Sequence, residues 1–203
     1  IEEAINQGIP TEKGSLKQLN ALSGEGVHQG VLVRLKKIPS SDLRSLVKDL
    51  STNSFAFVLD SINDPQNVGA VLRVAVAIKA VAVVLSQRKG ALLTPGVHRA
   101  SAGLSFFAPV TAPGNLVGAV KDLKSAGFWI VAASSSNEAQ DATKFDWPEK
   151  TALILGSEES GIRPLLLRES DYHIRLPMEP KVESLNVAVA SGILAYLWKQ
   201  RWG

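Results

Sequence analysis

Continuous apolar runs alternate with amphipathic segments over most of this chain. Strands are predicted at residues 55–59, 81–85, 106–110, 128–132, 151–155 and 173–176. Helices are predicted between and after them, at residues 68–78, 95–102, 116–124, 164–168 and 184–200. Strands that are apolar throughout and separated by helices are typical of a parallel sheet buried on both faces. The pattern therefore predicts an α/β fold, with a mostly parallel sheet covered by helices on both faces.

The first 54 residues lack this regular alternation. We expect a short helix at 2–7, a helix or loop at 16–22, a strand at 30–35 and a helix at 41–50 that Ser41 caps. Residues 1–38 are too few to form a core, and we interpret them as the C-terminal remnant of a preceding domain. Residues 39–54 are expected to be a linker with its helix, and residues 55–203 the main domain. Because the chain begins with Ile1, without a signal or transit pattern, we expect an internal start.

Composition excludes several kinds of site. The chain of 203 residues has no cysteine, which excludes disulfides, cysteine nucleophiles and cysteine-based zinc sites. Its histidines, His28, His98 and His173, are far apart and show no metal-ligand spacing, so no metal is expected. No apolar run is long enough to cross a bilayer, so no membrane partner is expected.

The distribution of charge says more than the net charge of +3. No Asp or Glu occurs from Pro65 to Lys121. The basic residues of that stretch are Arg73, Lys79, Arg88, Lys89, Arg99 and Lys121. This asymmetry favours a polyanionic partner such as RNA. The alternative is that acidic residues from elsewhere in the chain fold back beside it.

Three polar motifs follow predicted strands, at the edge where parallel sheets bind ligands. The first holds Asn67 and Arg73, the second Gly156 and Glu158 before Gly161, and the third Ser184, Leu185 and Asn186 after Pro177 and Met178. Taken singly, each has a plainer interpretation: a surface arginine, a Gly-rich turn with solvated acids, and a helix that Ser184 caps. None is a P-loop or a dinucleotide fingerprint, which argues against a nucleotide-dependent oxidoreductase.

In this order and spacing, the motifs resemble those of the SpoU/TrmH RNA ribose 2′-O-methyltransferases of the SPOUT superfamily, over residues 55–200. His28-Gln29-Gly30 resembles the end of the ribosomal-protein-like RNA-binding domain of members that modify large-subunit ribosomal RNA. The resemblance implies a C-terminal deep trefoil knot, a homodimer, and S-adenosylmethionine as methyl donor. It implies 2′-O-methylation of RNA, most directly of a guanosine in large-subunit ribosomal RNA.

The resemblance also assigns roles to residues. It implies catalytic roles for Arg73, Asn67, Glu158, Ser184 and Asn186, and cofactor contacts for Gly156, Leu176, Leu185 and Ala133. Because a guanidinium stays protonated, we expect Arg73 to clamp the phosphate beside the target ribose, with Glu158 fixing Arg73 through a charge-assisted pair. Whether the base is Arg73, the phosphate or water stays open.

Two alternatives remain at this point. One is a transfer RNA 2′-O-methyltransferase. The other is a catalytically silent RNA-binding or ribosome-assembly factor of the same fold, because Lys79, Glu159 and Pro180 stand where the family usually has glycine. The expected compartment is the cytoplasm if the source is bacterial, and the mitochondrion or plastid if it is eukaryotic.

Overall fold

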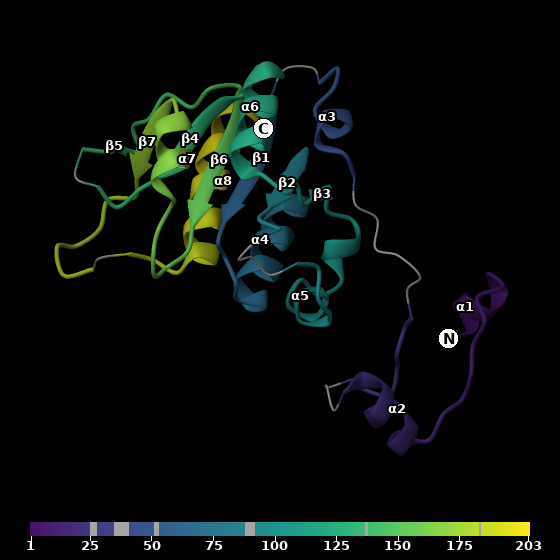
Figure 1. The fold of residues 1–203 in the computed structure, drawn as a ribbon. Coiled ribbons are helices and arrows are strands. Elements are labelled where there is room, and N and C mark those ends of the chain that lie inside the picture. The colour runs from purple at the N-terminus through teal and green to yellow at the C-terminus, as the bar shows by residue number, and fades with distance from the viewer. Residues whose placement is uncertain (25–27, 35–40, 51–52, 88–91, 137, 183) are drawn as a thin grey trace. The chain divides into compact units, whose positions relative to one another are not determined.

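The computed structural model describes residues 1–24, 28–34, 41–50, 53–87, 92–136, 138–182 and 184–203. The chain divides into two compact units, Ile1–Ile38 and Pro39–Gly203. The first unit contains helices α1 (Glu2–Asn6) and α2 (Leu16–Ser23) (Figure 1). None of its described residues is buried, which agrees with the expectation that it cannot form a core alone.

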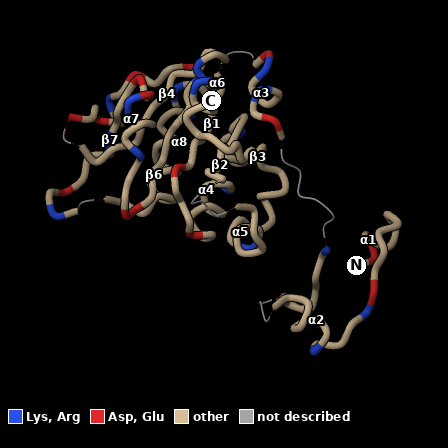
Figure 2. Tube along the Cα trace, viewed as in Figure 1, with Lys and Arg blue, Asp and Glu red and all other residues tan. Residues whose placement is uncertain are grey.

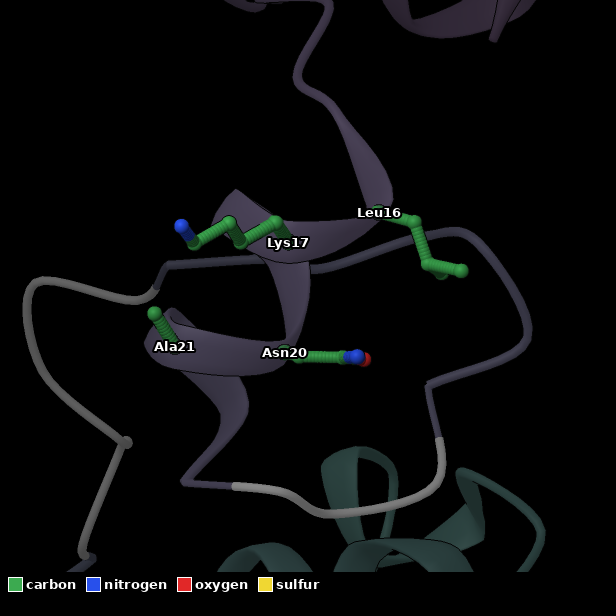
Figure 3. A pocket seen from close by; sticks show the side chains of 4 residues that line it. All are labelled: Leu16, Lys17, Asn20 and Ala21. Atoms are coloured by element: carbon green, nitrogen blue, oxygen red, sulfur yellow. The ribbon is translucent and has the colours of Figure 1, made fainter.

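Helix α2 is stabilised locally. Ser15 and Gln18 form a reciprocal capping box at its start. A shallow hollow along α2 is lined by Leu16, Lys17, Asn20 and Ala21 (Figure 3) and contains none of the predicted site residues.

The predicted strand at 30–35 is wrong for its described part, because residues 30–34 pair with no neighbouring strand. A strand without a partner leaves its backbone hydrogen bonds unmade, so alternation of side chains alone does not produce one.

The second unit is built on a parallel sheet. Its strands are β1 (Ser54–Asp60), β2 (Ala82–Leu85), β3 (Val110–Thr111), β4 (Trp129–Ala133), β5 (Gln140–Asp141), β6 (Lys150–Gly156) and β7 (Tyr172–Arg175). They lie in the order β3-β2-β1-β6-β4-β7-β5, and every neighbouring pair is parallel. The α/β fold with a parallel sheet is therefore confirmed.

Helices cover both faces of this sheet (Figure 1). On one face lie α4 (Pro65–Ile78), α5 (Pro95–Ala100) and α8 (Val187–Trp202), and on the other lie α3 (Leu43–Leu46), α6 (Leu116–Ser125) and α7 (Pro164–Glu169). Strand β1 supplies both cores, because Phe55 and Phe57 face the first set of helices while Ala56 and Val58 face the second. Its burial on both sides explains why the sequence of β1 is apolar throughout.

In the second unit, two predictions of secondary structure before α8 need correction and one strand was missed. Residues 106–110 were expected to be a strand, but Leu104–Phe106 form a 3₁₀ turn and only Val110–Thr111 pair with β2. Asp42, not Ser41, caps α3, which spans only Leu43–Leu46. The short edge strand β5 has no apolar run and was not predicted.

Helix α5 is held tightly against α4. A Cβ atom at Gly69 of α4 would overlap the Ala100 side chain and would lie 2.8 Å from the backbone nitrogen of Ser101. One turn further along the same side of α4 lies Arg73, because residues four apart share a helix face. The glycine therefore fixes α5 and the following turn beside the helix that carries two predicted site residues.

His98 ties α5 to the turn that follows it. Its Nδ1 lies 2.7 Å from Ser105 Oγ, and its ring stacks on Phe106 with centroids 4.4 Å apart. Burial lowers the pKa of His98 below its ordinary 6.5. The folded protein therefore disfavours the protonated imidazole.

We expect this histidine to make stability depend on pH. Below about pH 6.5 the unfolded chain binds a proton that the folded chain resists, so stability is complete above that pH and falls as the pH drops. His98→Asn keeps a hydrogen-bonding atom at the position of Nδ1 and does not titrate. Melting temperatures measured from about pH 7.5 to about pH 5.5 should fall more steeply for the parent than for His98→Asn. Parallel slopes would contradict the assignment.

Candidate active site

The three polar motifs meet at the carboxyl edge of the sheet. Asp60 at the end of β1 is in register with Gly156 at the end of β6, and Ala133 at the end of β4 is in register with Ile174 of β7. The loop after β1 leads into α4, the loop after β6 carries Glu158, and the segment after β7 leads into α8. Parallel strands place all these loops at one edge.

Asn67, Glu158 and Asn186 form one hydrogen-bonded cluster. Asn186 Nδ2 donates to Glu158 Oε1 (2.8 Å) and to Asn67 Oδ1 (2.9 Å). Asn67 Nδ2 donates to the same Glu158 oxygen (3.2 Å), and the backbone N–H of Val187 approaches it at 3.4 Å. Side chains from three distant parts of the sequence thus fix one another in this polar cluster.

Asn186 is the N-cap residue of α8. Its Oδ1 accepts from the backbone nitrogens of Ala188 (3.0 Å) and Val189 (3.4 Å). Since the oxygen is committed to the helix, the amide nitrogen must face Glu158 and Asn67. The prediction that Ser184 caps a helix over 184–200 is therefore wrong. The helix begins at Val187, and the asparagine that looked unsuited to a helix interior is its cap.

Ser184 and Arg73 are both exposed and lie outside this cluster. The predicted pair between Glu158 and Arg73 is not formed, because the hydrogen bonds described above occupy Glu158 Oε1 and no ion pair joins the two described residues. Asn67 and Arg73 are six positions apart on α4, which separates them by about 120° around the helix. Within the described chain, Arg73 has no hydrogen-bond or ion-pair partner, so its guanidinium is available to a ligand.

The residues expected to contact the cofactor lie around the same edge. Gly156, Leu176, Leu185 and Ala133 are each half-buried. A Cβ atom at Gly156 would collide with the backbone of Gly161 and Ile162, because the chain returns at the Ser157–Gly161 bridge. Gly156 is therefore required by the turn itself. The half-buried Leu176 and Leu185 leave apolar surface at the same edge of the sheet, which suits an adenosine group.

Sequence reasoning missed an ion pair at this edge. The Asp60 side chain is completely buried, and its Oδ1 accepts from Arg163 Nε at 2.8 Å. The available signal was an aspartate that ends an otherwise apolar strand, since a buried carboxylate needs a partner. The partner could not be identified from spacing, because it lies 103 positions away.

Helices α4 and α5 differ in charge from the loops beside them, which carry Asp60, Asp64, Glu158 and Glu159. Figure 2 shows Lys and Arg, but no Asp or Glu, along α4 and α5, as the sequence requires.

Within the described ranges, no group of three or more His, Asp or Glu side chains is arranged to hold a metal ion. No helix in the same ranges combines the length and apolar content needed to cross a membrane.

Comparison with known proteins identifies relatives of this arrangement. Over 177 residues, the chain is 36% identical to the 23S rRNA (guanosine-2′-O-)-methyltransferase RlmB of Pseudomonas syringae, covering 85% of this chain and 70% of the relative. It is 32% identical over 198 residues to RlmB of Xanthomonas axonopodis, covering 96% and 79% respectively.

Solved structures agree with this relationship. The AdoMet-bound rRNA methyltransferase of Sinorhizobium meliloti superposes with a TM-score of 0.73 at 25% identity, covering 80% of this chain. The aligned part spans 61% of that protein's chain. The profile of the SpoU rRNA methylase family matches residues 54–196, from the first strand of the sheet into α8. The chain therefore belongs to the SpoU rRNA methylase family.

Proposed function

We propose that this protein transfers a methyl group from S-adenosylmethionine to a ribose 2′-hydroxyl of RNA. The proposed target is the ribose of a guanosine in large-subunit ribosomal RNA. The observation that carries the proposal is the Asn67–Glu158–Asn186 cluster at the carboxyl edge of the sheet. The RlmB relatives are named for the same reaction on 23S ribosomal RNA. The basic α4–α5 region suits a polyanionic substrate.

The residues at the strand ends fit the methyl donor. When bound, S-adenosylmethionine supplies an electrophilic methyl group on a sulfonium. Leu176, Leu185 and Ala133 would offer half-buried apolar surface to it, and Gly156 would offer its backbone.

The reaction requires alignment and loss of a proton. The ribose oxygen attacks the methyl carbon, the carbon–sulfur bond breaks, and the hydroxyl proton passes to the phosphate or to water. Arg73 would clamp the neighbouring phosphate and lower the hydroxyl pKa by its positive charge. Asn67, Glu158 and Asn186, together with Ser184, would hold the ribose in line.

The alternative of a catalytically silent RNA-binding factor rested on Lys79, Glu159 and Pro180, and the positions of these residues give it little support. Lys79 is the C-cap of α4 with a φ of 59°, a left-handed position where glycine is favoured for backbone reasons alone. A lysine there costs roughly 1 kcal/mol of local strain and leaves the cluster untouched. Glu159 and Pro180 are exposed, and neither takes part in the cluster.

Methyl transfer itself is the direct test. The purified protein would be incubated with radiolabelled S-adenosylmethionine and either unmodified ribosomal RNA or transfer RNA, and nucleosides from the digest would be separated. Label in 2′-O-methylguanosine of the ribosomal RNA is expected. Label confined to transfer RNA would favour the first alternative, whereas RNA binding without label would favour the silent factor. Mapping 2′-O-methyl sites in cells lacking the protein would then locate the target.

We also propose that the chain after β7 passes through a knot. Strand β7 lies between β4 and β5, which are joined in sequence by residues 134–139. Ala133 and Gln140 are both in register with Ile174, so the chain passes from one side of β7 to the other between these two residues. This geometry supports threading of the segment that begins at Leu176 beneath the 134–139 connection.

A homodimer is part of the same proposal. Helix α8 exposes Val189, Ile193 and Tyr196 by 52%, 40% and 60%, and their spacing puts them on one face. Exposed apolar side chains gathered on one helix face are typical of protein interfaces. We expect Ile193→Lys to halve the mass measured by light scattering. Leu165→Lys, at an exposed leucine of α7, is the matched control and should leave the mass unchanged. A monomeric parent would refute the dimer.

Finally, we propose that residues 1–38 belong to an RNA-binding domain. Their described part buries no residue, and His28-Gln29-Gly30 resembles the end of such a domain, which supports this assignment. For a bacterial source, the proposed function places the protein in the cytoplasm, where ribosomal RNA is modified.

A further inference from the structure

We propose that Asp60 is a positioning residue that acts through Arg163 to hold the turn at residues 157–161 in its cofactor-binding position. The proposal rests on the function proposed above. It adds a residue pair that lies outside the Asn67–Glu158–Asn186 cluster and that none of the three motifs contains.

Asp60 gathers donors from two directions. Oδ2 accepts from the backbone nitrogen of Arg163 (2.9 Å), and Oδ1 accepts from Arg163 Nε (2.8 Å) and from Ser61 Oγ (3.2 Å). One residue therefore presents both its backbone and its side chain to a single carboxylate. This double contact fixes where residue 163 lies relative to the end of β1, and in which direction the chain leaves the turn.

Asp60 is buried, and a buried carboxylate depends on its hydrogen-bond donors. The Asp60 side chain is 0% exposed, whereas that of Arg163 is 51% exposed. A buried carboxylate is unfavourable unless its hydrogen bonds are complete, so the loss of one donor is expected to disturb the site. Of the nitrogens in the Arg163 guanidinium, Nε bonds to Asp60, and the exposed remainder of the group adds no further bond to it. Positional restraint is therefore the main effect of the pair.

The restraint reaches the cofactor residues through a short chain of contacts. Arg163 follows Gly161 and Ile162, whose backbone is packed directly against Gly156. Ser157 and Gly161 form a bridge, and Ser157 Oγ lies 2.7 Å from Ser160 Oγ, which closes the turn that carries Glu158. Gly156 is held to β1 by strand pairing, so a shift of residue 163 would change how the turn at 157–161, with Glu158, lies against Gly156.

The test uses a pair of isosteric substitutions. Asp60→Asn places an amide N–H against Arg163 Nε–H, so two donors face each other. Arg163→Gln keeps a hydrogen-bonding atom at the position of Nε, and Gln can donate or accept. We expect Asp60→Asn to weaken S-adenosylmethionine binding by about tenfold in calorimetry, and Arg163→Gln to weaken it by less than about threefold. In the double variant, the glutamine oxygen introduced at position 163 accepts from the amide introduced at position 60, and binding should recover to within about threefold of the parent.

Asp171 provides a matched control at the opposite edge of the sheet. Its carboxylate likewise joins a cation, Lys124 (2.8 Å), to a backbone nitrogen, that of Ile130 (2.8 Å). Asp171→Asn should lower the melting temperature, by less than Asp60→Asn because its side chain is 24% exposed, and should leave the cofactor affinity unchanged.

The outcomes separate this inference from the proposed function. Unchanged affinity in Asp60→Asn, or no recovery in the double variant, would overturn the positioning role while the parent still binds cofactor and methylates RNA. Equal loss of affinity in Asp171→Asn would also overturn it, because general destabilisation would then explain the effect. A parent that binds no S-adenosylmethionine would refute both proposals.

Discussion

Arg73→Ala is expected to lower methyl transfer by about 10²–10³-fold, while the dissociation constant of S-adenosylmethionine changes by less than about twofold. Arg73 is exposed, so its removal breaks no hydrogen bond or ion pair among the described residues. The loss should therefore appear in single-turnover rates on saturating RNA. Calorimetry would measure cofactor binding, and the melting temperature should be unchanged.

Two further variants sharpen this result. Arg73→Lys keeps the charge but loses the planar fork that can hold a phosphate with two bonds, so most of the activity should still be lost. Arg168→Ala removes another exposed arginine, on α7 at the opposite face of the sheet, and should have little effect. Full activity in Arg73→Lys would mean that charge alone is sufficient and that the bidentate clamp is wrong.

Asn186→Asp should lower methyl transfer by about 100-fold near pH 8, although the substitution changes only one terminal group. The new carboxylate can still cap α8, because its oxygen can accept from Ala188 and Val189. It loses the amide N–H groups that bind Glu158 and Asn67, and it brings a second negative charge to within about 3 Å of Glu158. Repulsion between the two carboxylates therefore opposes the closed arrangement of the cluster.

A second substitution separates the added charge from the lost amide. Asn186→Ser supplies a good cap without the charge or the amide, so it should lose less activity than Asn186→Asp. Single-turnover rates of the parent and the two variants measure the difference. Equal losses in the two variants would show that the charge at residue 186 is not felt by Glu158.

The strands of the fold were predictable where burial on both faces makes the sequence apolar throughout. Strands β1 and β6 are apolar throughout because helices cover both of their faces, and both were located within a residue at each end. The segment at 106–110 has the same apolar character, yet Phe106 and Phe107 are exposed. Hydrophobicity does not reveal whether a neighbouring strand is available for pairing. For this reason the paired but polar strand β5 was missed, and the apolar but unpaired segment at 30–35 was wrongly predicted as a strand in its described part.

The site was predictable where side chains act at strand ends, and not where contacts depend on register. Asn67, Glu158 and Asn186 were named from their motifs, and the structure brings them together. Ser184 was expected to cap the last helix, but Asn186 caps it, and the two could not be told apart because both residue types are good caps. The Asp60–Arg163 pair depends on how the turn after β6 returns to the end of β1, which no local pattern specifies.

The strand order has a consequence for how the protein folds. Strand β6 lies between β1 and β4 although it is made after both, and Ser54 is in register with Lys150. Pairing across such a separation requires closure of a long loop, which slows folding. Glu158 therefore reaches its partners only when this late insertion is complete, and Asn186 only when the C-terminal segment has docked. Cofactor binding should then appear as one of the last events in refolding, after most of the secondary structure has formed.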